Sequence, residues 1–98
     1  MSGNGVKADP PNGGLTLQAV RLATTPEGEE GRLVITPAGL VIAILVLIDP
    51  VSEGADPAAG SWFLEAGFGP CQTAVPPIFA GLSDACSWIA AQIRTGLF

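Results

Sequence analysis

The alternation of apolar and polar residues along the chain predicts four β-strands. Residues 15–23 alternate in the manner of a half-buried strand, and residues 61–68 do the same. A short β-branched run at 32–35 predicts another strand. Residues 40–48 are continuously apolar, and their stiff Val and Ile side chains favour a strand. We take this last run as the central strand of one sheet.

The central run has two alternative interpretations. Thr36 followed by Pro37 is a good helix start, so a buried helix over 37–47 competes with the strand. A membrane span is the other alternative, but the apolar stretch is interrupted by Pro37 and Gly39 and is shorter than the ~20 residues that a span needs. The sequence Thr-Pro-Ala-Gly at 36–39 also fits a type I turn, which favours the strand.

The C-terminal part of the chain predicts a helix. Ser83 is a good N-cap, Asp84 follows in the first turn, and Gly96 is a stop signal. Apolar residues recur between them at helical spacing, at Ala85, Trp88, Ile89 and Ile93. The predicted fold is therefore α+β, an antiparallel four-stranded meander with one C-terminal helix packed on one face. Residues 1–14, rich in Gly, Asn and Pro, are expected to be a flexible N-terminal segment, and residues 15–98 a single domain.

The central strand is apolar on both of its faces, whereas one helix covers only one face of a sheet. An antiparallel strand with one solvated face should alternate apolar with polar residues, and this strand does not. The second face therefore needs a cover, which could be the N-terminal segment, a second copy of the chain or a different protein. The alternative is that curling of the strand and the Pro-rich loop close this face internally. The residues expected to form this apolar interface are Ile42, Ile44, Val46 and Phe63.

Acidic residues exceed basic ones by nine to four, so the formal net charge is −5. This balance argues against direct binding of nucleic acid, whose phosphates require Lys and Arg. In a meander, the connections at 24–31 and 49–60 lie at the same end of the sheet, where they gather six acids with Arg32 nearby. These acids are a candidate surface for a basic protein partner, or else ordinary solubilising charges. They are Glu27, Glu29, Glu30, Asp49, Glu53 and Asp56.

The chain offers little catalytic chemistry. It has no histidine, which removes the commonest general base and metal ligand. Two cysteines, Cys71 and Cys86, are too few for a zinc site. We interpret them as two buried thiols, with a single disulfide as the alternative. We therefore expect no catalytic residues, cofactor or metal. Residues 1–14 have no apolar leader segment, and we expect a cytoplasmic protein without a membrane anchor.

These observations favour a small acidic protein that binds other proteins and is not an enzyme. Its most concrete form is an inhibitor whose acidic end blocks the basic groove of a nucleic-acid-binding complex, like the inhibitors that phage direct against CRISPR or restriction systems. The alternative is a structural or assembly subunit that forms a homodimer or larger homo-oligomer through the apolar second face.

Overall fold

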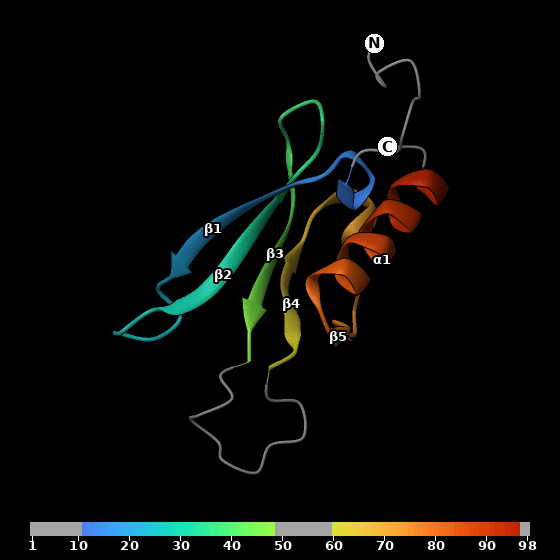
Figure 1. Ribbon diagram of the computed structural model, residues 1–98. Helices are drawn as coiled ribbons and strands as arrows, with labels where there is room; N and C mark the ends of the chain where they lie inside the picture. The colour runs from blue at the N-terminus through green and yellow to red at the C-terminus, as the bar shows by residue number, and fades with distance from the viewer. Residues whose placement is uncertain (1–10, 49–59, 97–98) are drawn as a thin grey trace.

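A computed structural model describes residues 11–48 and 60–96, which form one antiparallel sheet with a single α-helix on one side (Figure 1). The strands follow one another across the sheet in chain order, from β1 to β5. The α+β meander predicted from the sequence is confirmed, with five strands instead of four. The elements are η2 (Pro11–Gly14), β1 (Thr16–Leu22), β2 (Glu29–Ile35), β3 (Val41–Leu47), β4 (Trp62–Gly67), η3 (Gly69–Cys71), β5 (Ile78–Phe79) and α1 (Leu82–Thr95).

The central apolar run forms strand β3, so the alternative of a buried helix over 37–47 is wrong. The turn before it is closed by hydrogen bonds in which the Gly39 N–H donates to the Thr36 carbonyl at 2.8 Å and the Thr36 N–H donates to the Leu40 carbonyl at 2.8 Å. Gly39 has a φ of 88°, a conformation that favours glycine. In the described residues, no helix is both long and apolar enough to cross a membrane.

Strand β2 begins three residues earlier than the β-branched run predicts. Glu29, Glu30 and Gly31 belong to β2, because the ladder with β1 continues to the pair formed by Leu22 and Glu29. Pairing with β1 thus places in strand β2 polar residues that were expected in the loop.

Strand β5 was not predicted from the sequence. It has two residues and pairs with Trp62 and Phe63 of β4. Two residues are too few to show alternation, and the prolines at 76 and 77 immediately before them are typical of irregular structure.

Helix α1 begins one residue before the predicted N-cap. Gly81 is the N-cap, its backbone is extended, and its carbonyl accepts a hydrogen bond from the Ala85 N–H at 3.1 Å. Ser83 therefore lies inside the first turn, and no side chain caps the helix. The prediction of Ser83 as N-cap is wrong because the chain turns into the helix at the glycine.

The core lies between α1 and one face of the sheet. Both cysteines belong to it as free, buried thiols, which confirms the interpretation made from the sequence. The Phe79 and Trp88 rings pack with their centroids 5.7 Å apart. The buried members of the core are Leu15, Val34, Ile42, Ala43, Leu45, Trp62, Leu64, Cys71, Phe79, Ala85, Cys86 and Ile89.

Candidate protein-binding surface

The face of the sheet turned away from the core carries a row of paired residues that crosses all five strands. Val20 pairs with Gly31, Gly31 with Val46, Val46 with Phe63, and Phe63 with Ile78. Because paired residues point to the same side of a sheet, the side chains of this row share one face.

Two further rows extend this surface. One joins Gln18, Leu33, Ile44 and Ala66, and the other joins Thr16, Ile35 and Val41. Only the two members from the edge strand β1 are polar, and no charged residue occurs in the three rows. We call the apolar members of the three rows the second face: Val20, Leu33, Ile35, Val41, Ile44, Val46, Phe63, Ala66 and Ile78.

The second face has no cover in the part of the chain that the structure describes. Helix α1 lies on the opposite side of the sheet (Figure 1), and no second-face residue belongs to the cluster of core residues that includes α1 or packs against that cluster. Val41 and Ile78 are 39% and 54% exposed, whereas Val46 at the middle of the face is only 5% exposed. The other six residues are partly buried, so the face is a continuous apolar surface that is least exposed at Val46.

Position 31 has room only for glycine, because the Leu22 side chain lies against it. A Cβ atom on Gly31 would lie 2.8 Å from a methyl group of Leu22 and 2.8 Å from the Leu45 carbonyl oxygen, closer than such atoms approach one another. The Leu22 side chain thus fills the space that a residue larger than glycine would take. The row that crosses all five strands therefore has no gap at Gly31, because the apolar Leu22 side chain occupies that space.

The structure brings together three of the four residues expected at the apolar interface. Ile44, Val46 and Phe63 lie on the second face, but Ile42 is 1% exposed and belongs to the core. A β-bulge explains the difference, because Val34 pairs with Ala43 while Ile35 pairs with Val41, so Ile42 is the extra residue of β3. A bulge breaks the strict alternation on which the sequence prediction relied.

The acidic end of the sheet is only partly described. Asp49, Glu53 and Asp56 lie outside the described residues. Glu27 is exposed in the β1–β2 turn, and Glu29 accepts a hydrogen bond from the Thr24 hydroxyl. Glu27, Glu29 and Glu30 lie near the turn of the β1–β2 hairpin, where Glu29 and Glu30 are consecutive residues of β2 and so point to opposite faces of the sheet.

Two arginines offset these glutamates, where the sequence suggested one. Arg32 forms an ion pair with Glu30 at 3.0 Å. Arg21 pairs with Glu30 across the ladder and donates hydrogen bonds to the backbone carbonyls of Glu27 and Gly28, at 3.3 and 2.9 Å. The formal charge of the hairpin is therefore −1, from two arginines and three glutamates. The described residues give this end only a weak negative field.

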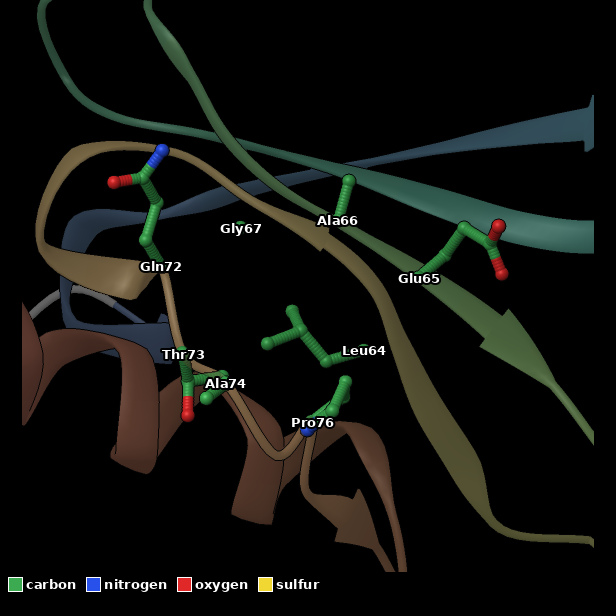
Figure 2. A pocket seen from close by; sticks show the side chains of 8 residues that line it. All are labelled: Leu64, Glu65, Ala66, Gly67, Gln72, Thr73, Ala74 and Pro76. Atoms are coloured by element: carbon green, nitrogen blue, oxygen red, sulfur yellow. The ribbon is translucent and has the colours of Figure 1, made fainter.

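An open groove of about 540 Å³ lies between β4 and the segment 72–76 (Figure 2). Leu64 projects into it, whereas the Glu65 carboxylate points away from that segment. The described lining holds no base beside a nucleophile, so the groove offers no catalytic pair. Its lining residues are Leu64, Glu65, Ala66, Gly67, Gln72, Thr73, Ala74 and Pro76.

Burial keeps the two thiols in their neutral form. Desolvation raises the pKa of Cys71 to about 11 and also raises the pKa of Cys86. A neutral, inaccessible thiol is a poor nucleophile and metal ligand. Within residues 11–48 and 60–96, no three His, Cys, Asp or Glu side chains group together as a metal site requires.

Sequence reasoning missed several second-face residues, notably Val20 on β1, Leu33 on β2 and Ile78 on β5. Leu33 lies in a predicted strand, but the strand register that places it beside Ile44 was not readable from one sequence.

Comparison with known proteins found no matching family model, no similar curated protein and no matching solved structure.

Proposed function

We propose that the chain is a small non-catalytic protein-binding module that acts through the second face. The observation that supports this proposal is the set of nine apolar residues on one sheet face, without a charged residue in their rows or a covering element in the described structure. Monomeric proteins rarely expose so continuous an apolar surface, and such surfaces are typical of interaction sites. The central positions, Ile44, Val46 and Phe63, are the expected contacts.

Interfaces of this kind have a closely packed apolar centre and a polar rim. Val46 and Phe63 lie at the middle of the second face, and the polar residues Thr16 and Gln18 lie at its β1 edge. An aromatic side chain at the centre of such a patch is a common energetic anchor. The arrangement therefore suits binding of another apolar protein surface.

The test is capture of partners by immobilised protein. We expect Ile44→Lys to abolish capture, because it places a charge at the centre of the contact. Val75→Lys is the matched control, since Val75 is 80% exposed and lies outside the second face. Equal capture by the unmodified protein and by Ile44→Lys would refute the proposal.

The inhibitor hypothesis remains a second proposal, supported by the position of the acidic hairpin at one end of the meander. In this form the partner has a basic groove, and the second face serves another purpose. Reversing the charges of Glu27, Glu29 and Glu30 to lysine should then abolish binding of a nucleic-acid-processing complex. The weak net charge of the described hairpin gives this form less support than the second face has.

A further inference from the structure

The second face is apolar along its three rows and has no cover in the described residues. Resting on the proposed function above, we propose that the occupant is a second copy of this chain, packed face to face as a symmetric dimer. Ile44, Val46 and Phe63 of each copy would form the centre of the contact. The dimer would then be a two-sheet sandwich with a helix on each outer side.

The charge distribution restricts an identical partner to the second face. Each copy carries a net charge of −5, so two copies repel one another wherever their charged residues meet. The three rows of the second face carry no charge, and the register shift leaves the exposed Glu65 unpaired on β4 between Phe63 and Ala66. Repulsion between two copies on this face is therefore confined to that acid and to Glu29 at the rim. A partner that binds through opposite charges would find no charged residue in the three rows to pair with. A second copy of the chain would present the same apolar residues at the centre of the contact.

The area of the face is sufficient for a weak dimer. Strands ~4.8 Å apart with a rise of ~3.4 Å per residue give the whole outer side of the sheet, from β1 to the short β5, a footprint of about 500 Å², of which the three rows take about 400 Å². Two copies then bury about 1,000 Å² in total, which is near the lower limit for a specific interface. We therefore expect a dimer that dissociates on dilution.

The geometry of sheet packing is consistent with this contact. Sheets in a sandwich lie ~10 Å apart, and their side chains interdigitate. A two-fold axis near Val46 places the same residues of both copies at the centre, as an isologous interface requires. Glu29, paired with Leu22 at the end of the β1–β2 ladder, would lie toward the rim in both copies.

The free edge of the sheet is a less suitable contact. Strand β1 is the first strand of the sheet and has seven residues, so its outer edge is unpaired in the described structure. Pairing of two β1 edges would, however, leave both second faces exposed on the same side of one larger sheet. It would not remove the apolar surface that requires a partner.

Sedimentation equilibrium of the full chain, from micromolar to millimolar concentration, tests the proposal. We expect a monomer–dimer equilibrium in which added salt strengthens the dimer, because salt screens the repulsion between two negative copies. Ile44→Lys should raise the dissociation constant roughly tenfold or more, because the symmetric interface carries the substitution twice. Val75→Lys should leave it unchanged. Val41→Lys, at a position already 39% exposed, repeats the test should Ile44→Lys not fold, as judged by circular dichroism.

Two outcomes would overturn the face-to-face dimer. A dimer lost in Gln18→Pro but retained in Ile44→Lys would show pairing through the β1 edge. A chain that stays monomeric at every concentration would refute self-association. In that case, loss of a heterologous partner by Ile44→Lys alone would leave the protein-binding function intact, whereas equal partner capture by all variants would refute the function as well.

Discussion

The guanidinium carbon of Arg32 lies 5.1 Å from the centre of the Trp62 ring. Trp62 is buried in the core, so the arginine covers a ring that would otherwise meet water. Arg32 also forms the exposed ion pair with Glu30. One side chain thus closes the core at the end of the sheet where the acidic hairpin lies.

Replacement of Arg32 should separate these two contacts. We expect Arg32→Ala to lower the free energy of unfolding by about 1 kcal/mol, mainly through lost contact with the ring. Glu30→Gln should cost less than about 0.5 kcal/mol, because exposed ion pairs contribute little. Urea unfolding followed by tryptophan fluorescence measures both. A larger loss in Glu30→Gln than in Arg32→Ala would contradict the ring contact.

Gly67 is required by the close approach of β4 to η3. A Cβ atom at this position would lie 2.0 Å from the Cys71 carbonyl oxygen, which is backbone and cannot move aside cheaply. We expect Gly67→Ala to destabilise the fold by about 2 kcal/mol or more, in the range of overpacking. The control is Gly81→Ala, where a Cβ atom meets nothing within 4 Å and the cost should be that of a weaker N-cap alone. Thermal unfolding compares the two, and equal losses would contradict this account.

The buried thiols give the fold a distinct dependence on alkaline pH. The folded pKa of Cys71, about 11, exceeds its ordinary value of 9.0, so the folded state retains a proton that the unfolded state loses. The thiol contribution to stability is complete below about pH 9 and is lost as the pH rises towards 11. The free energy of unfolding should therefore fall over that interval, and the fall should be smaller in Cys71→Ala. An equal fall in both proteins would show that Cys71 does not cause it.

The thiols should also resist modification. We expect Ellman's reagent to react slowly with the native chain, and two thiols to react at once in denaturant without a reductant, because Cys71 and Cys86 are free and buried. Absence of reactive thiols in denaturant would instead show a disulfide.

The sequence predicted the elements whose signal is local. The continuous apolar run gave β3, and the helical spacing of Trp88 and Ile89 gave α1. Features that depend on pairing were missed. These include the two-residue strand β5, the extension of β2 through Glu29, and the bulge that turns Ile42 into the core.

The candidate surface shows the same division. Its existence followed from the apolarity of β3 on both sides, but its extent depended on which residues pair across the strands. Ile78 joins the surface only because β5 pairs with Phe63. Likewise, the role of Arg21 in offsetting the acidic hairpin follows from its place opposite Glu30 in the ladder.

The central claim, that the second face is covered by protein, is tested most directly by site-directed labelling. A cysteine introduced as Ile44→Cys would report on the second face, and Val75→Cys on an exposed control, since both natural thiols are buried. The rate of maleimide labelling is measured as the concentration of unlabelled chain increases. We predict that labelling at position 44 slows with concentration while labelling at position 75 does not. Unchanged rates at both positions, with the unlabelled chain or with host lysate added, would contradict the claim.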